Sequence, residues 1–418
     1  MISRRGKNSN SIGLLPRTCL WAPSRMLLED LAVIVEGKAR VVVPKMEKFV
    51  RQDGLVEPSW APVFYNPYMK DNRTLTCLLI ETFSDLRHRV RTFVEPLAGA
   101  CVRTVRVLLE TGTDYGYACD INPLAIYLCR KNLCINGLQN RMTVEVNDAN
   151  RMLIQLDREG IIIDAIDIDP FGSPVYYVLS AARALGKGGL LIMTATDLGA
   201  LEGKYPEVAR RRYGVYTRRT DYSKELAARV LAGTVARMLA IVDRGVRPIF
   251  TIYDRHYIKL AVYVEHNKKK ALESLNKVGY FCVGEHGYPE RHSRLPVGCS
   301  EMGIIGPIWL DSLWDDRVVQ AIHAKLESLE VSGERVTPVT RSTLRKVDRI
   351  LSELRVNAPF YYRLNKICSK LKRDVPSLER LIERLREMGF AASRTHFDPV
   401  GIRTTADFKT LLSLIAQA

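Results

Sequence analysis

The chain has 418 residues, enough for two domains, and its 47% hydrophobic and 26% charged residues are typical of an ordinary soluble globular protein. Its net charge of +16 favours a polyanionic partner, nucleic acid before an anionic membrane, although an inert basic surface would give the same total. No apolar run approaches the ~18 residues of a membrane span, so we expect no membrane partner.

The first 25 residues are basic and lack the continuous apolar segment and the small-residue cleavage site of a secretory signal. This composition predicts a disordered basic arm over residues 1–25, or an extension upstream of a chain that starts at Met26. We therefore expect a cytoplasmic protein.

The nine cysteines are odd in number and scattered, and no CxxC pair occurs among them. This pattern predicts reduced, mostly buried thiols in a cytosol. The nearest approach to a metal site, Cys282, His286, His292 and Cys299, matches no common zinc spacing, so we expect no metal.

Between residues 90 and 200, short apolar runs alternate with segments whose apolar residues recur at helical spacing. The alternation predicts parallel βαβ units in a doubly wound α/β sheet, whose ligands bind outside the carboxyl ends of the strands. The predicted strands are 92–97, 115–120, 143–148, 165–169 and 189–197, and the predicted helices are 102–111, 123–135, 150–157 and 174–185.

The pattern changes after residue 220. A long helix is expected at 222–243, and two apolar runs at 247–254 and 257–265 predict an antiparallel hairpin at the sheet edge. We place a domain boundary near residue 266. Beyond it we expect a smaller α+β domain with a Gly/Pro-rich loop stretch at 284–307 and helices at 316–328, 337–354 and 375–388.

Three predicted strands end in an acid: Asp120, Asp148 and Asp169. The first strand is followed by EPLAGACVRTVR, without the GxGxxG fingerprint of NAD or FAD sites. S-adenosylmethionine (SAM) has no phosphates and needs no such loop, and carboxylates suit its ribose hydroxyls and adenine amine. We therefore expect Asp120 at the ribose and Asp148 near the adenine of SAM, although each could instead be a helix N-cap.

The stretch AIDIDPFGSP, residues 165–174, predicts the Asp-Pro-aromatic turn that is used to methylate exocyclic amines of bases. Such an amine is a poor nucleophile, and a carboxylate that accepts its N–H stabilises the charge that develops in transfer. Asp169 is therefore the predicted catalytic residue, and the Phe171 ring offers a face for an extruded base. Asp167 is expected to be structural. The alternative is a plain strand-to-helix turn capped by Ser173 or Asp169.

The chain resembles the tRNA guanine-26 N2-dimethyltransferase family in DIDPFGSP and in further blocks. The blocks are EGKARVVVP (36–44), VFYNPYMKDNRTLT (63–76), GGLLIMTATD (188–197), RRYGVYTRRTDYSKELAARVL (211–231) and GFAASRTHFDPVGIRTTADF (389–408). The resemblance implies a Rossmann-like class I SAM-dependent methyltransferase domain at 26–266 and a tRNA-binding C-terminal domain at 267–418. It implies methylation of the exocyclic N2 of guanosine 26 in tRNA to N2,N2-dimethylguanosine, and we expect a monomer.

The resemblance also implies roles for individual residues. Those that would contact the methyl donor are Arg73, Arg103, Asp120, Asp148 and Ala149. Asp169 would be catalytic, and Phe171 and Phe64 would frame the flipped guanine. Without the family, Phe64 could be a core aromatic residue and Arg103 a solvated helix residue. One departure concerns the donor, because Cys101 stands where the family's motif has a glycine.

The segment ARRRYGVYTRRTDY, residues 209–222, combines arginines with tyrosines, which suits phosphate contact and base stacking in RNA. The predicted RNA-binding residues are Arg210, Arg211, Arg212, Arg218 and Arg219; a solvated helix face is the alternative. Two other functions stay open at this point. One is methylation of a base amine in another RNA or in DNA, and the other is RNA binding without catalysis on a methyltransferase fold.

Overall fold

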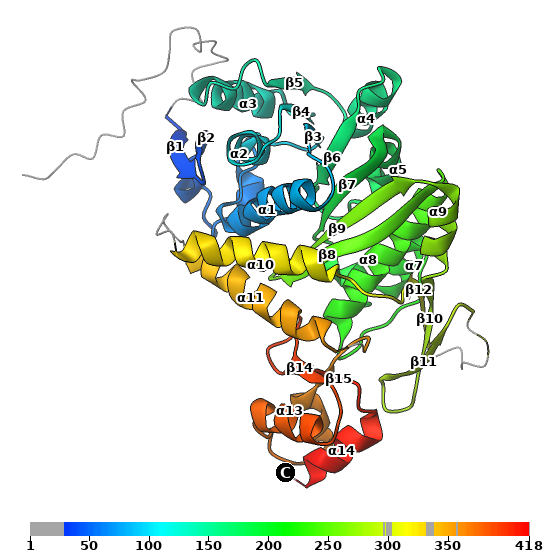
Figure 1. The fold of residues 1–418 in the computed structure, drawn as a ribbon. Coiled ribbons are helices and arrows are strands. Elements are labelled where there is room, and N and C mark those ends of the chain that lie inside the picture. Colours follow the sequence, from blue (N-terminus) through cyan, green and yellow to red (C-terminus); the bar gives the residue numbers. More distant parts are fainter. Residues whose placement is uncertain (1–28, 296, 298–302, 332–337, 357, 418) are drawn as a thin grey trace, which may run out of the picture. The chain divides into compact units, whose positions relative to one another are not determined.

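The computed structural model describes residues 29–295, 297, 303–331, 338–356 and 358–417 (Figure 1). The predicted arm at 1–25 lies outside the described residues. The chain divides into two compact units: unit 1 spans Met1–Cys77 and Arg89–Met152, and unit 2 spans Leu78–His88 and Leu153–Ala418. Across the described ranges, no helix has both the length and the hydropathy that crossing a bilayer requires.

Unit 1 contains an antiparallel hairpin and three parallel strands in the order β5-β4-β3. Helices α2 and α3 pack against these strands and against β2. The strands are β1 (Leu31–Glu36), β2 (Ala39–Pro44), β3 (Thr92–Glu95), β4 (Tyr115–Asp120) and β5 (Met142–Val146). The helices that begin in unit 1 are α1 (Lys70–Leu86), α2 (Val102–Glu110), α3 (Pro123–Ile135) and α4 (Ala149–Arg158), with short 3-10 turns at η2 (Met46–Lys48), η3 (Pro58–Trp60) and η4 (Pro67–Met69).

Unit 2 contains four strands in the order β6-β7-β9-β8. β6 and β7 are parallel, whereas β9 runs antiparallel to both β7 and β8. The predicted α/β class and its antiparallel edge hairpin are therefore confirmed. The strands are β6 (Ile163–Ile168), β7 (Leu185–Ala195), β8 (Arg244–Asp254) and β9 (Tyr257–His266), and the helices are α5 (Val175–Ala184), α6 (Leu198–Leu201), α7 (Pro206–Tyr213), α8 (Ser223–Ala240) and α9 (Lys268–Leu275).

The remainder of unit 2 adds two three-stranded sheets, β11-β10-β12 and β13-β15-β14. The strands are β10 (Val278–Val283), β11 (Pro289–Ser293), β12 (Ile304–Trp309), β13 (Tyr362–Arg363), β14 (Ala392–Arg394) and β15 (Gly401–Thr404). The helices are α10 (Asp316–Val331), α11 (Pro338–Leu354), α12 (Leu364–Leu371), α13 (Leu378–Glu387) and α14 (Phe408–Ala416).

The loop prediction for 284–307 was wrong, because β11 and the start of β12 lie in this stretch. Its glycines and prolines indicate turns, but β12 accommodates Pro307 as an edge strand of its sheet. An edge strand tolerates proline because the missing N–H needs no partner strand.

A cluster of buried ionisable side chains joins α8, α11 and β15. Arg403, only 2% exposed, donates hydrogen bonds to Glu225 Oε2 at 2.6 Å and to Glu353 Oε2 at 3.0 Å. Glu353 Oε1 lies 2.6 Å from His396 Nδ1. Burial would raise the pKa of Glu353, but the charges of His396 and Arg403 outweigh it and hold that pKa at about 2.

We expect acid to destabilise the protein through Glu353. Its pKa is about 2 in the folded chain, below the usual value of 4.5, so its contribution to the free energy of unfolding is complete above 4.5 and declines as the pH falls toward 2. Melting temperatures (Tm) measured between about pH 6 and pH 3 should fall with pH. In the Glu353→Gln variant this fall should be shallower, and an equal slope in both proteins would contradict the assignment.

Candidate active site

A loop after β3 holds the carboxylate of Asp120. Gly99 has a φ of +51°, and a Cβ on it would lie 3.0 Å from the carbonyl oxygen of Phe64, so the backbones approach closely here. The N–H groups of Gly99 and Asn122 each donate a hydrogen bond of 2.9 Å to Asp120, one to each carboxylate oxygen. Each oxygen retains acceptor capacity, which is what two ribose hydroxyls require.

The predicted adenine-side residues lie at the start of α4. Asp148 Oδ1 accepts a hydrogen bond of 3.0 Å from the N–H of Arg151, so Asp148 does cap the helix, as the alternative interpretation held. Its side chain remains exposed, whereas Ala149 is buried. An N-cap carboxylate keeps further lone pairs, so capping and contact with an amine are compatible.

Arg73 is buried in an ion-pair cluster with Glu36. Its Nε and Nη2 donate hydrogen bonds of 2.6 and 2.7 Å to the two oxygens of Glu36, which also accepts from Tyr65 Oη at 3.0 Å and from Arg106 at 3.1 Å. Burial alone would raise the pKa of Glu36, but Arg73 and Arg106 lower it to about 2. The cluster anchors the segment around Tyr65 to β1.

Arg103 is also buried, so the alternative interpretation of Arg103 as a solvated helix residue was wrong. It is 4% exposed and donates to Glu95 Oε1 at 3.0 Å, to Asn72 Oδ1 at 2.8 Å and to Thr76 Oγ1 at 2.8 Å. Glu95 further accepts from Thr104. Arg103 therefore ties the end of β3 to α1 and α2, around the loop that holds Asp120.

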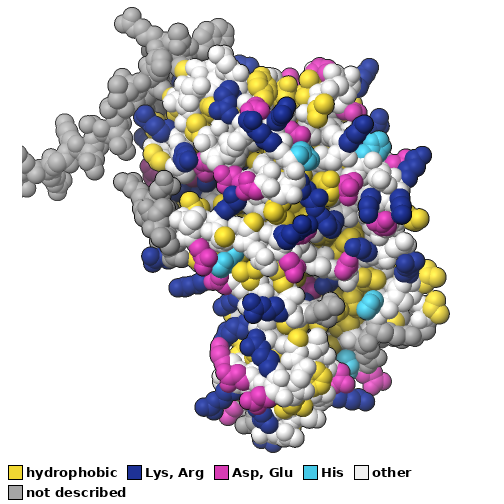
Figure 2. Space-filling view, viewed as in Figure 1, with side chains coloured by type: hydrophobic (Ala, Val, Ile, Leu, Met, Phe, Trp, Pro, Cys, Tyr) yellow, Lys and Arg dark blue, Asp and Glu magenta, His cyan; other side chains and the backbone are white. Residues whose placement is uncertain are grey.

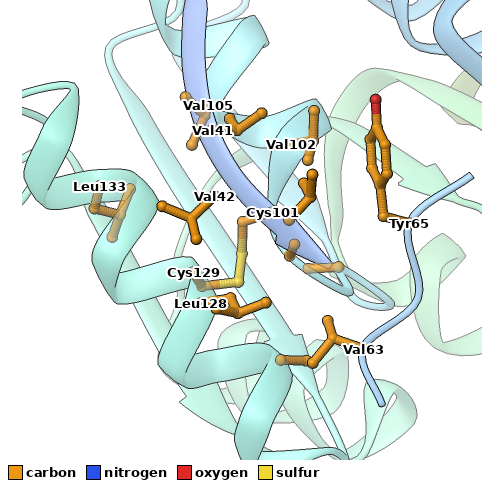
Figure 3. Packing of buried hydrophobic residues seen from close by; sticks show 14 of the residues in the cluster. Val41, Val42, Val63, Tyr65, Cys101, Val102, Val105, Leu128, Cys129 and Leu133 are labelled. Carbon is orange, nitrogen blue, oxygen red and sulfur yellow. A yellow bond between two sulfur atoms is a disulfide. The ribbon is translucent and has the colours of Figure 1, made fainter. Parts of the chain in front are cut away.

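A disulfide joins Cys101 to Cys129, and both residues are completely buried in a hydrophobic cluster (Figure 3). The prediction of reduced thiols was wrong for these two residues, and Cys134 and Cys282 are disulfide-bonded as well. Cys77, Cys119 and Cys368 keep their thiols. Scattered spacing misled the prediction because residues 28 positions apart in sequence meet between α2 and α3.

The disulfide explains the departure at Cys101. This residue has φ 57° and ψ 23°, the left-handed region that favours glycine, and it immediately precedes α2. Its bond to Cys129 ties the loop of Gly99 to α3, and Asn132 of α3 also donates to the carbonyl oxygen of Ala100 at 2.8 Å. Two links from α3 thus fix the loop that orients Asp120.

We expect Cys129→Ala to lower the free energy of unfolding by about 3–4 kcal/mol, because it opens a loop of 28 residues and leaves Cys101 in a left-handed conformation. The double change Cys101→Gly with Cys129→Ala should recover about 1 kcal/mol, since glycine adopts that conformation without cost. Thermal unfolding without reductant measures both. Equal Tm values for the single variant and the unmodified protein would contradict the bracing role.

The Asp-Pro-Phe-Gly turn follows β6 and is held from two sides. Gly172 N donates to Thr196 Oγ1 at 2.8 Å, and Thr196 N donates to the Gly172 carbonyl at 2.9 Å. Ser173 Oγ lies 2.7 Å from Tyr213 Oη, which also lies 2.7 Å from Asp197. The turn is thereby fixed to the ends of β7 and α7.

The fixed turn exposes the predicted stacking ring. Phe171 is 71% exposed, whereas Asp167 on β6 is completely buried and accepts a hydrogen bond of 3.2 Å from Lys259. This burial agrees with the structural role expected for Asp167. Asp169 lies half-buried at the end of the strand. Phe64, in unit 1, is 38% exposed and so is not a core aromatic residue.

The arginine-rich segment, residues 209–222, contacts Asp197, one of the supports of this turn. Arg212 makes an ion pair of 2.6 Å with Asp197, and Arg210 lies over the ring of Tyr216 at 5.6 Å. Arg210, Arg211 and Arg219 are exposed, and Arg218 is half-buried. Sequence reasoning missed Asp197 and Tyr213 as supports of the turn, although both lie in the family blocks 188–197 and 211–231.

Comparison with known proteins identifies the family. The family model described as N2,N2-dimethylguanosine tRNA methyltransferase matches residues 37–416. The chain belongs to this tRNA methyltransferase family. A tRNA (guanine(26)-N(2))-dimethyltransferase of Metallosphaera sedula is 34% identical over 92% of this chain and 96% of that protein, and one of Pyrococcus abyssi is 30% identical over 93% and 100%.

The structure of the Trm1 protein of Pyrococcus horikoshii in complex with S-adenosyl-L-methionine matches with a TM-score of 0.80 and 29% identity, over 92% of this chain and all of that one. The resemblance read from the sequence blocks is therefore confirmed.

Among the described residues of this methyltransferase, no group of three or more His, Cys, Asp or Glu side chains is arranged to hold a metal ion.

Proposed function

We propose that this chain transfers methyl groups from SAM to the exocyclic N2 of guanosine 26 in tRNA and forms N2,N2-dimethylguanosine. The observation that carries the proposal is the family match over residues 37–416, in a chain that retains the Asp-Pro-Phe turn. An altered loop at Cys101 is what would favour RNA binding without catalysis, and the disulfide to Cys129 accounts for that change.

Asp120, Asp148, Ala149, Arg73 and Arg103 form the proposed donor side. Asp120 accepts the ribose hydroxyls, and Asp148 lies by the adenine. The donor supplies an electrophilic methyl group on a sulfonium sulfur. Arg73 and Arg103 are buried and paired with Glu36 and Glu95, so we assign them to positioning the donor-binding backbone as well as to the donor itself.

Asp169 is the proposed catalytic residue. Its carboxylate would accept an N–H of the guanine amine and so orient the amine. Transfer would form a C–N bond and break the C–S bond of the donor, and the Asp169 carboxylate would stabilise the positive charge that develops on the nitrogen. The proton then leaves the nitrogen to Asp169 and passes to solvent. Two such rounds give the dimethylated base.

Phe171 and Phe64 are the proposed stacking residues for the guanine. We expect Phe171→Ala to lower kcat/KM for tRNA by about tenfold to a hundredfold, because base–aromatic stacking is worth about 1–3 kcal/mol. The Phe171→Tyr variant keeps a ring and should retain most activity. Steady-state methylation with each variant decides this, and wild-type kcat/KM in Phe171→Ala would refute the stacking role.

The proposed phosphate contacts are Arg210, Arg211, Arg212, Arg218 and Arg219. The proposed domain that binds the body of the tRNA spans residues 267–418. We also propose that the protein acts as a monomer in the cytoplasm. Figure 2 shows Lys and Arg side chains spread over the face in view, with Asp and Glu among them. Charge alone therefore marks no single binding surface on this face. We single out the arginines at 210–219 because the tyrosines beside them can stack on RNA bases.

The deciding experiment is methyl transfer from labelled SAM to an unmodified tRNA transcript, followed by nucleoside mass analysis. The control transcript carries adenosine in place of guanosine 26. N2,N2-dimethylguanosine in the first and none in the second is the expected result. Transfer to neither transcript by a protein that binds SAM would overturn the proposed substrate.

A further inference from the structure

A pocket of about 560 Å³ lies in unit 2, away from the Asp-Pro-Phe turn in sequence, and aromatic rings dominate its lining. The rings come from the β10–β11 region, from the chain around β13 and from the start of α14. They include Phe281, His286, Tyr288, Phe360, Tyr362 and Phe408. The volume falls within the range typical of small-molecule and cofactor pockets.

The rings fall into a buried set and an accessible set. Phe281, Tyr288 and Phe360 are at most 4% exposed and form a packed base, in which Phe281 and Phe360 meet at 4.9 Å. His286 and Phe408 are half-buried. Their ring centroids lie 4.4 Å apart with 32° between the planes. Partly exposed rings on a packed base are a surface on which a flat, aromatic ligand can stack.

Polar groups occur beside the rings, in Thr405, Asp407 and Lys409, all exposed. Lys409 supplies positive charge and Thr405 a hydroxyl group that can donate or accept. A nucleobase presents two π-faces and an edge of donors and acceptors, and RNA-binding proteins recognise unstacked bases with this combination.

The pocket is connected to the arginine-rich segment. Tyr288 Oη lies 3.3 Å from Asp221 Oδ2, and the ring of Tyr222 lies 4.4 Å from that of Phe360. Asp221 and Tyr222 follow Arg219, which is exposed. These contacts place the end of the arginine-rich segment beside the buried base of the aromatic pocket.

We propose that this aromatic pocket binds an unstacked base of the tRNA, at a second place distinct from the guanosine that is methylated. The proposal rests on the proposed function, because it takes the tRNA as substrate. A base held there adds affinity for tRNA without taking part in the methyl transfer. Binding at both places requires a folded RNA that presents one nucleotide to the aromatic pocket and another to the Asp-Pro-Phe turn.

The first test uses two variants that remove a ring face and one that restores it. Phe408→Leu keeps apolar volume, His286→Ala removes a half-buried ring, and His286→Phe restores a flat ring. We expect the tRNA dissociation constant to rise about tenfold in the first two and to stay within about twofold in the third, since stacking is worth roughly 1–3 kcal/mol per base. SAM affinity, Tm and kcat at saturating tRNA should be unchanged.

The second test is ultraviolet cross-linking of tRNA to the unmodified protein, with mass analysis of the nucleotide-bearing peptides. A peptide that contains His286 or Phe408, joined to a nucleotide other than guanosine 26, is the expected product. Any one of three results would overturn the proposal. They are unchanged tRNA affinity in both ring-removing variants, a loss of tRNA affinity in His286→Phe equal to that in His286→Ala, and no cross-link in the pocket. The proposed function is tested by a different measurement: it fails if the unmodified protein transfers no methyl group to tRNA.

Discussion

Asp169→Asn is expected to lower kcat for methyl transfer by at least about a hundredfold, while the SAM dissociation constant changes by less than about twofold. The amide keeps the shape of the side chain but loses the negative charge that stabilises the developing cation, and removal of one such interaction typically costs 10²–10³ in rate. Single-turnover transfer from labelled SAM measures the chemical step, and calorimetric titration measures SAM affinity.

The matched control is Asp157→Asn on α4. Asp157 is a partly exposed acid that pairs loosely with Arg183, at 3.8 Å, and it loses the same charge outside the turn. It should transfer methyl groups at the rate of the unmodified protein. Retention of near-full rate by Asp169→Asn would remove Asp169 from the mechanism, whatever the control shows.

Arg403→Met should lower Tm by roughly 10 °C, the largest effect on stability that we expect. Arg403 is the shared partner of Glu225 and Glu353, which are 0% and 1% exposed, so its loss removes one positively charged partner from each of two buried carboxylates. Glu225 keeps its pair with Arg229, and Glu353 keeps its contact with His396. Breaking a buried pair in this way costs about 3–5 kcal/mol, which at about 2–4 °C per kcal/mol in a large domain corresponds to roughly 10 °C. Differential scanning calorimetry measures the change.

Arg394→Met is the control for this effect. Arg394 pairs with Glu379 on the surface, with 37% and 60% of the two side chains exposed, and exposed pairs contribute about 0–1 kcal/mol. We expect a change in Tm of less than about 3 °C. Similar losses in both variants would mean that the change to methionine, and not burial of the pair, sets the cost.

The sheet could be predicted from the sequence because its signals are local. β4 and α3 have the predicted bounds, 115–120 and 123–135, since each combines one unbroken hydrophobic period with a terminal Asp or an Asn-Pro start. The turn at 169–174 was equally recognisable, because its chemistry lies in consecutive residues. In these places the information for structure and for function is contiguous in the chain.

Other features depend on pairings that no local pattern encodes. The Glu36–Arg73 pair joins segments 37 positions apart, and Glu95 and Arg103 meet across the loop between β3 and α2. The arginines therefore appeared in the sequence as ligand contacts without their buried partners. The disulfide of Cys101 depends on where α2 and α3 bring two cysteines together. The ring of Phe408 lies at the start of the last helix, 122 positions after His286, so the aromatic pocket has no sequence motif.

The Cys101–Cys129 bond also constrains how this chain can change in evolution. A lineage that lost Cys129 first would keep a non-glycine residue in a left-handed conformation with nothing to compensate for it. A lineage that replaced Cys101 by glycine first would pass through a relaxed loop with one buried thiol, a milder intermediate. Replacement of Cys101 before Cys129 is therefore the easier order. We expect relatives with glycine at position 101 to carry cysteine or another residue at position 129, and relatives with cysteine at position 101 to carry cysteine at position 129 as well.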